Sequence, residues 1–320
     1  MLAQLIAMPV QHTGHTQCAG CICSTPASRK RLSTQYGVSL IELMVGIVVG
    51  LLVVAVAMGA LMVSRSVTGT VSDASNIQQQ AAYVLRIMGM QLRQAGSMRL
   101  NLDPGTTAAA ETYLIPVAFE TAISSAKSME SFNPATHTLG GKDSPVNLTA
   151  GSRRDPESVF GSSTPQALIR NCIGGPAEKD SSGNVTKDVR LESVFALDPS
   201  EPNVLRCAGN GEAAQPIANN VANFQIRYIV QDNATTPGIP TLKTVNASGV
   251  TSWGQVQAVE VCLVFYGTEA MDLPSGSNYI DCDGTAVDMS TLTGERDRRM
   301  HIAFRNVFQL RSQGLIGSVL

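Results

Sequence analysis

A single carboxylate, Glu42, lies at the edge of the most apolar stretch of the chain. Residues 43–63 follow it without a charged side chain. A helix of this length, at about 1.5 Å per residue, covers roughly 30 Å, which is the thickness of a bilayer's hydrocarbon core. An acid at such a boundary needs a proton or a cationic partner. The chemistry open to Glu42 is therefore a charge pair, and the alternative is an interfacial side chain that reaches headgroup water.

Basic residues flank this stretch on one side only. Arg29, Lys30 and Arg31 precede it, no acid occurs in the first 37 residues, and only Arg65 follows closely. Because Lys and Arg accumulate on the cytoplasmic side of a span, this asymmetry predicts a cytoplasmic N-terminus and a large extracytoplasmic domain.

The cysteines fall into two groups. Four of them follow the apolar stretch, and an even number in an exported domain predicts two disulfides. Three pairings are open, and we favour pairing neighbours in sequence, because each link would tie a loop to a strand. A zinc site is the alternative, but it lacks Cys-x-x-Cys spacing. The favoured pairs are Cys172–Cys207 and Cys262–Cys282. The other cysteines lie in the basic N-terminal segment and could form a zinc site with nearby histidines. The residues are Cys18, Cys21, Cys23, His12 and His15. No second cluster of ligands elsewhere in the sequence supports such a site.

Other chemical signals are weak. Asp281, Asp283 and Asp288 faintly suggest a calcium loop but break the EF-hand register, so a polar turn beside a disulfide is the favoured interpretation. His137 and His301 have no partners that would form a nucleophilic triad, and no nucleotide-binding or metalloprotease motif is present. We therefore expect no enzyme, no cofactor and no metal.

Apolar spacing predicts one long helix. Apolar residues recur at steps of three and four after the uncharged stretch, and no proline lies between Val38 and Asp103. The helix should run to about Gly96, a natural C-terminal stop. The residues of the stripe are Val67, Val71, Ala74, Ile77, Ala81, Val84, Leu85, Met88 and Leu92.

The remainder of the chain favours β-structure. Residues 113–119 could form a short strand, and the rest of residues 101–165 is expected to be a long loop region. Stronger alternation predicts strands over residues 189–197, 221–231, 255–266 and 300–311. The predicted fold class is α+β, a long N-terminal helix packed on an antiparallel sheet.

The stretch Gly-Val-Ser-Leu-Ile-Glu-Leu at residues 37–43 resembles the processing site of the type IV prepilin family. Val38 and Ser39 replace the Phe and Thr that are common in that family. The resemblance implies cleavage after Gly37 by prepilin peptidase and N-methylation of Val38. It also implies that Glu42, the fifth mature residue, pairs with a neighbouring subunit's α-amine during assembly.

This resemblance also implies how the chain is divided. Residues 1–37 would be a cleaved cytoplasmic leader, residues 38–64 the transmembrane and filament-core half of the helix, and residues 65–97 its amphipathic half. Residues 98–320 would form an extracytoplasmic β-rich head with two disulfides. The mature chain would carry 20 Lys and Arg against 25 Asp and Glu, a net charge of −5, which does not favour nucleic acid as a main partner.

Features of the C-terminal part resemble PilW-type minor pilins more narrowly. They are Leu205-Arg206-Cys207-Ala208-Gly209, the strand at residues 256–266, and Arg298-Arg299-Met300-His301 leading to Phe304-Arg305-Asn306-Val307. The expected function is a structural subunit, held in the inner membrane and then incorporated at or near the pilus tip. Its role would be to initiate assembly and to support adhesion, twitching motility or DNA uptake.

The expected partners are other minor pilins, the major pilin and the inner-membrane assembly platform. Two alternatives stay open on the sequence. A minor pseudopilin of a type II secretion system would share the same signal and helix. A membrane-tethered periplasmic enzyme or binding protein belongs to another class, and the missing catalytic motifs argue against it.

Overall fold

A computed structural model describes residues 37–101, 118–119, 123–179, 182–232 and 241–311. The chain divides into two compact units, one ending at Met58 and one beginning at Gly59. Helix α1 (Leu40–Gln94) supplies the described helical part of the first unit and continues into the second. The predicted α+β class is confirmed.

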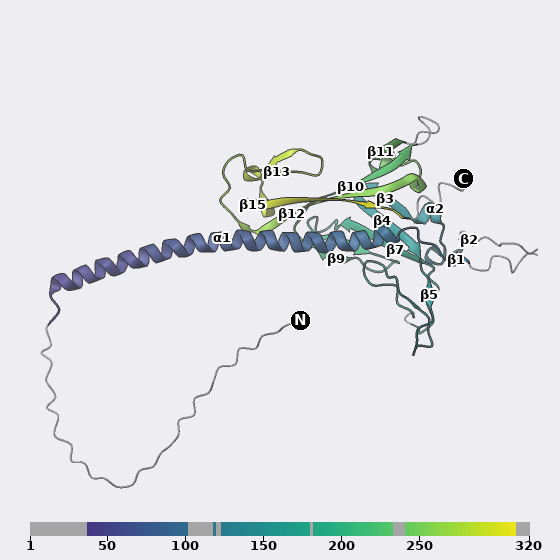
Figure 1. The fold of residues 1–320 in the computed structure, drawn as a ribbon, viewed down its shortest axis with the longest axis horizontal. Helices are drawn as coiled ribbons and strands as arrows, with labels where there is room; N and C mark the ends of the chain where they lie inside the picture. The colour runs from purple at the N-terminus through teal and green to yellow at the C-terminus, as the bar shows by residue number, and fades with distance from the viewer. Residues whose placement is uncertain (1–36, 102–117, 120–122, 180–181, 233–240, 312–320) are drawn as a thin grey trace, which may run out of the picture. The chain divides into compact units, whose positions relative to one another are not determined.

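Two antiparallel sheets build the second unit (Figure 1). The first has the order β11 (Thr241–Val245), β10 (Val221–Asp232), β12 (Val256–Ala270) and β15 (Arg299–Gln309). The second has the order β3 (Leu139–Asp143), β4 (Val146–Arg153), β7 (Arg190–Leu197), β8 (Leu205–Ala208) and β9 (Gln215–Ala218).

Three short hairpins and several single turns complete the described elements. The hairpins pair β1 (Leu100–Asn101) with β2 (Ala118–Phe119), β5 (Pro156–Glu157) with β6 (Gln166–Ala167), and β13 (Asn278–Ile280) with β14 (Ala286–Asp288). The turns are α2 (Pro134–His137), η1 (Ser128–Glu130), η2 (Ala247–Gly249), η3 (Trp253–Gln255), η4 (Met289–Thr291) and η5 (Gly294–Arg296).

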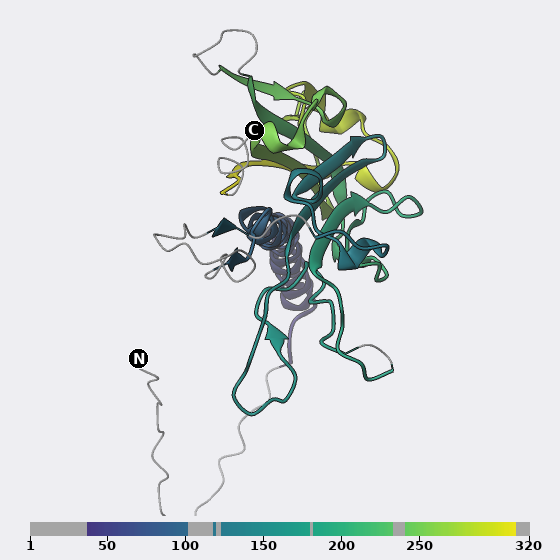
Figure 2. The same cartoon turned by 90° about the vertical axis from the view of Figure 1, so that its right-hand side faces the viewer.

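One hydrophobic core joins the C-terminal part of α1 to both sheets. Val84, Met88 and Leu92 are fully buried and belong to the same cluster as Phe195 of β7 and Val261 of β12. Figure 2 shows the C-terminal part of α1, in blue, beside the strands. The apolar stripe was therefore predicted correctly from Ile77 onward.

The stripe does not begin as early as predicted. Val71 is 64% exposed, and among the described side chains of α1 the first buried one is Asp73 at 2%. The carboxylate of Asp73 accepts a hydrogen bond from the Thr268 hydroxyl at 2.8 Å and one from the Glu269 backbone N–H at 2.7 Å. A polar contact with the end of β12 thus takes the place of the expected apolar one.

The end of α1 follows from glycine chemistry. Gly96 has a φ of +73° and its N–H donates to the Gly151 carbonyl at 2.8 Å. A left-handed residue just after a helix is where glycine costs least. The predicted stop near Gly96 is confirmed, and it joins the helix to the second sheet.

The expected loop over residues 101–165 was partly wrong. Residues 102–117, with most of the candidate strand at 113–119, lie outside the described residues, but β3 and β4 are regular strands of the second sheet. The polar and small residues of β4 hid this strand, because they lack the β-branched and aromatic alternation that marks strands. Small size is required there, since a Cβ at Gly151 would collide with the His137 carbonyl.

Candidate functional site at the start of the long helix

The predicted processing residues lie immediately before helix α1. Gly37, Val38 and Ser39 lie outside regular secondary structure and are exposed, and α1 begins at Leu40. Ser39 caps the helix, because its Oγ accepts the Glu42 N–H at 3.3 Å and its carbonyl accepts the Leu43 N–H at 3.1 Å. Glu42 therefore lies in the first turn, where the positive end of the helix dipole favours a carboxylate.

Sequence reasoning missed the role of Ser39. The pattern Ser-x-x-Glu before an apolar run is a known signature of a helix N-terminus, and residues 39–42 carry it. A helix that starts at Leu40 leaves the Gly37–Val38 peptide bond outside regular structure, where an enzyme can reach it.

The apolar stretch is exposed along its whole length, and no described residue buries it. Residues Leu40–Met62 form the one candidate membrane span found among the described residues, and none of it is buried. Outside the local helix backbone, no atom of the described residues lies within 4 Å of where a Cβ would lie on Gly46 or Gly50, so none of these residues packs against either glycine. A contiguous apolar surface of this kind indicates contact with lipid or with other helices.

Glu42 also lacks a partner in the described part of the chain. No described residue forms an ion pair or a side-chain hydrogen bond with its carboxylate. Any charge that balances Glu42 at the edge of an apolar environment must then come from outside these residues.

The four cysteines of the head lie in pairs. The structure joins Cys172, in a loop, to Cys207 of β8, and it joins Cys262 of β12 to Cys282 beside the β13–β14 hairpin. This is the pairing favoured from the sequence. Cys18, Cys21 and Cys23 lie outside the described residues.

The carboxylates of the suspected calcium loop have local donors. Asp281 accepts from the Asn223 amide, Asp283 from the Thr285 N–H and hydroxyl, and Asp288 from the N–H and hydroxyl of a serine two residues on. These hydrogen bonds lower the pKa of Asp283 and Asp288. The described residues contain no group of three or more metal-ligating side chains, and the turn interpretation fits this geometry.

His301 is buried in an aromatic stack. Its ring lies 4.9 Å from that of Tyr279 and 5.8 Å from that of Tyr266, and Arg296 donates to its Nε2 at 3.1 Å. Burial lowers the pKa of His301 to about 4, and the Arg296 charge acts in the same direction. A neutral, enclosed imidazole fastens the β13–β14 segment to β15.

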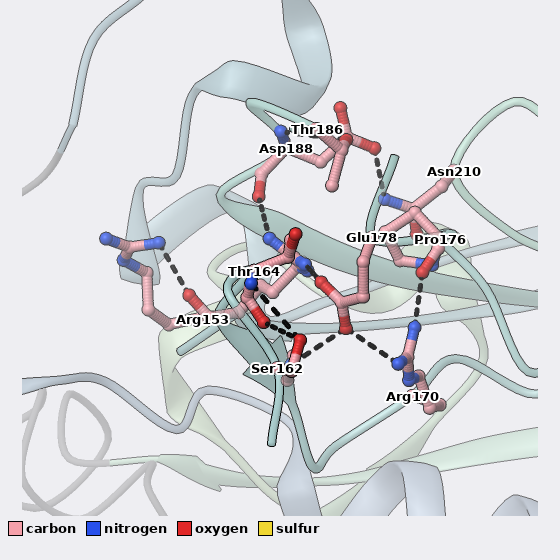
Figure 3. A network of polar contacts seen from close by, with 11 residues as sticks. Arg153, Ser162, Thr164, Arg170, Pro176, Glu178, Thr186, Asp188 and Asn210 are labelled. Atoms are coloured by element: carbon pink, nitrogen blue, oxygen red, sulfur yellow. Dashed lines mark hydrogen bonds and ion pairs between the residues drawn. The ribbon is translucent and has the colours of Figure 1, made fainter. Parts of the chain in front are cut away.

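A second polar network joins Arg154, which follows β4, to the segment from Ala167 to Glu178 (Figure 3). The Glu178 carboxylate is held by Arg154, by Arg170 at 2.6 Å and by the Ala167 N–H at 2.8 Å. Arg154 is 2% exposed, so this is a buried ion pair. Because two guanidinium groups and an amide already occupy it, Glu178 acts here as a structural clamp.

Comparisons with known proteins bear on this arrangement. The sequence model of the family described as type IV pilus-assembly protein W matches residues 195–312, which include β8, β10, β12 and β15. The C-terminal part of this chain is PilW-like. The predicted resemblance to PilW-like pilins is therefore confirmed for this part of the chain.

Two other comparisons add less. A type IV-like pilin from Thermus thermophilus has a similar structure at 10% sequence identity and a TM-score of 0.35, covering 74% of this chain and 96% of that one. Among curated proteins, none matches this sequence. The PilW-like region is preceded by one helix that is long and apolar enough to cross a membrane.

Proposed function

We propose that this chain is a minor type IV pilin that is cleaved after Gly37 and enters the pilus through α1. The observation that carries the proposal is the complete exposure of Leu40–Met62 directly after an accessible Gly37–Val38 bond. The same helix continues into a head whose C-terminal part is PilW-like. A single helix thus supplies a membrane anchor first and a filament contact later.

In this proposal Glu42 selects the assembled state. Cleavage creates an α-amine at Val38, and in a neighbouring subunit this amine supplies the cation that Glu42 lacks among the described residues of its own chain. In an apolar filament core no water competes for that pair, so an unpaired Glu42 is strongly disfavoured there. A charge pair of this kind favours correct axial placement over random insertion.

The proposed location follows from the charge asymmetry around the span. The leader lies in the cytoplasm, the head lies in the periplasm, and the assembled subunit lies at or near the pilus tip, where it supports initiation, adhesion, motility or DNA uptake. Its partners are the prepilin peptidase, the other minor pilins, the major pilin and the inner-membrane assembly platform.

Processing tests the proposal directly. In cells that contain prepilin peptidase, intact-mass analysis should find a mature chain that begins with N-methylated Val38. Gly37→Leu should leave the leader attached, whereas Gly46→Leu, a matched change on the open helix surface, should be cleaved normally. If the wild-type protein kept residues 1–37 in such cells, the proposal would be refuted.

We also propose that both disulfides form after export. Non-reducing peptide mapping of the head should recover the links Cys172–Cys207 and Cys262–Cys282. Free thiols at all four positions would overturn this part, while a different pairing would overturn only the connectivity.

A further inference from the structure

Strand β15 forms one edge of the first sheet, beyond β12 in the order (Figure 1). Hydrogen bonds show which of its residues face outward. The Tyr266 N–H donates to the Asn220 carbonyl, away from its β15 neighbour His301, and at the other end the Leu310 N–H donates to the Gln257 carbonyl. In an antiparallel ladder, bonded and non-bonded pairs alternate. The backbone groups of odd-numbered residues in β15 therefore point away from β12.

The first part of this edge is covered. The His301 N–H, which points away from β12, faces the Met289 sulfur at 3.4 Å. From residue 303 onward the described residues provide no such cover. The outward backbone groups there belong to Ala303, Arg305, Val307 and Gln309, and all four residues are exposed.

The other sheet edges carry features that discourage pairing. Strand β11 has five residues and presents Lys243, β3 has five and presents Lys142, and β9 has four and contains Pro216. Short edges, lysines and prolines all oppose the addition of a further strand. Strand β15 has eleven residues with neither lysine nor proline, and its register with β12 is continuous from Ala258↔Gln309 to Tyr266↔His301.

Arg305 is the one charged side chain in residues 303–309 of β15, and it does not block the addition of another strand. Arg305 donates to the Cys282 carbonyl at 2.8 Å and lies 3.6 Å from the Glu260 carboxylate. It is therefore turned over the sheet face and balanced by Glu260. The open edge is therefore close to neutral. It also exposes apolar side chains such as Val307, which is 49% exposed.

We propose that residues 303–309 of β15 form an interaction surface that pairs with an extended segment of a different pilus subunit. This inference rests on the proposed function, because only an assembled pilus supplies such a neighbour. Backbone hydrogen bonding gives the contact its strength, as in other cases of strand addition. Seven residues at about 3.3 Å each provide roughly 23 Å of edge, which is the length of an ordinary strand.

The chemistry of the edge defines the segment that fits. On one face Phe304 and Phe308 adjoin the core, so the incoming strand should present aliphatic or aromatic side chains there. On the other face it meets Ala303, Arg305 and Val307, where small or polar residues suit. Lysines and prolines should be absent from its bonding positions.

The decisive variant is Val307→Pro in the full-length protein. It removes an outward N–H and places a ring on the edge, but no bond to β12 is lost, because Val307 does not donate to that strand. Val307→Thr keeps the N–H and the β-branched shape and serves as the control. Val307→Lys adds a charge without changing the backbone, which covers the case in which the proline variant fails to fold.

We expect wild-type membrane levels, cleavage and head melting for Val307→Thr and Val307→Lys. In sheared pili, Val307→Pro and Val307→Lys should be depleted about tenfold and Val307→Thr should not. A photo-crosslinking residue at position 309 should join the chain, in cells that express the pilins of the same pilus, to a peptide of another pilin.

Other outcomes overturn the inference. Equal incorporation of all three variants would show that the edge is unused. Cross-links only to a second copy of this chain, or only to its own residues 312–320, would assign the edge to those occupants. Absence of the wild-type protein from pili would instead remove the proposed function itself, so the two failures are distinguishable.

Discussion

Residues 40–58 and residues 73–94 belong to one helix, yet their side chains are arranged in opposite ways. In the first stretch every residue is exposed and Glu42 is the only charged one. In the second, one face is buried in the core of the head and the other faces solvent, as in an ordinary amphipathic helix. Backbone hydrogen bonding is the same in both. What differs is the cover of each part: the second packs against the core of its own chain, whereas no described residue covers the first.

The largest effect should come from a buried charge in the second stretch. Val84→Asp places a carboxylate at a fully buried position, and we expect a loss of more than about 4 kcal/mol of head stability. Val54→Asp, the matched change in the first stretch, should leave head melting unchanged. It should instead weaken membrane insertion by about 3 kcal/mol. Thermal melting and membrane fractionation measure the two effects, and equal melting temperatures for both variants would contradict this comparison.

The next effect concerns the boundary at Asp73. Asp73→Ala leaves the Thr268 hydroxyl and the Glu269 N–H without their acceptor, and we expect a loss of about 2–5 kcal/mol. Asp73→Asn keeps one acceptor oxygen and should lose less. Asn76→Ala, at an exposed position on the same helix, is the control and should be close to neutral. Thermal unfolding of the detergent-solubilised protein tests the order of the three variants.

These two positions also show what could be predicted from sequence. Val84 lay in a strong apolar stripe, so helix, face and burial were all predictable. Asp73 interrupts the same stripe, and its partners are about 195 residues away in sequence, so no local pattern reveals the contact. An acid on the apolar face of a helix was a signal that something specific must satisfy it.

The strands also differ in how far they could be predicted from the sequence. The four strands of the first sheet alternate strongly or are rich in β-branched residues, and three of them, β10, β12 and β15, were predicted within a few residues, as was β7 of the second sheet. Strand β3 has two glycines among its five residues, and β4 carries Thr, Ala, Gly and Ser in succession. At Gly151 a backbone carbonyl leaves no room for a larger side chain. That these residues form strands depends on tertiary packing, which residue propensities alone do not predict.

A smaller effect should appear with pH, and only in the head. Residues 40–58 contain a single titratable side chain, whereas the head buries His301, whose pKa is lowered to about 4 from 6.5. Between about pH 4 and pH 6.5, His301 therefore binds a proton in the unfolded chain but not in the folded chain. Stability is fully present above about pH 6.5 and should decline as the pH falls toward 4.

His301→Phe tests this assignment. The ring can still stack between Tyr266 and Tyr279, but it cannot be protonated. The decline in melting temperature between pH 6.5 and pH 4 should become shallower than in the wild type. Asp281 and Arg296 also face this histidine, and their charges stay in place in the variant. An unchanged slope would show that other groups control the acid response.

The smallest effect on stability, and the largest on assembly, should come from Glu42→Ala. The carboxylate contacts no described residue, so head melting should match the wild type. Removing an acid from the edge of an apolar span makes insertion no harder, and cleavage after Gly37 should proceed. Only the pair with a neighbour's α-amine is lost, and without competing water nothing replaces it.

The expected result is a stable, processed protein that is depleted from sheared pili. Glu42→Asp keeps the charge one methylene shorter and should recover part of the incorporation, which an effect of helix capping or insertion alone would not explain. Quantitative immunoblots of sheared pili, normalised to membrane levels, measure this difference. If Glu42→Ala enters pili as efficiently as the wild type, the exposed half of α1 is held by apolar contacts alone, and Glu42 is only an interfacial residue. The two halves of α1 would then differ both in the partner that covers them and in their need for a specific polar contact, which only the half that contains Asp73 would have.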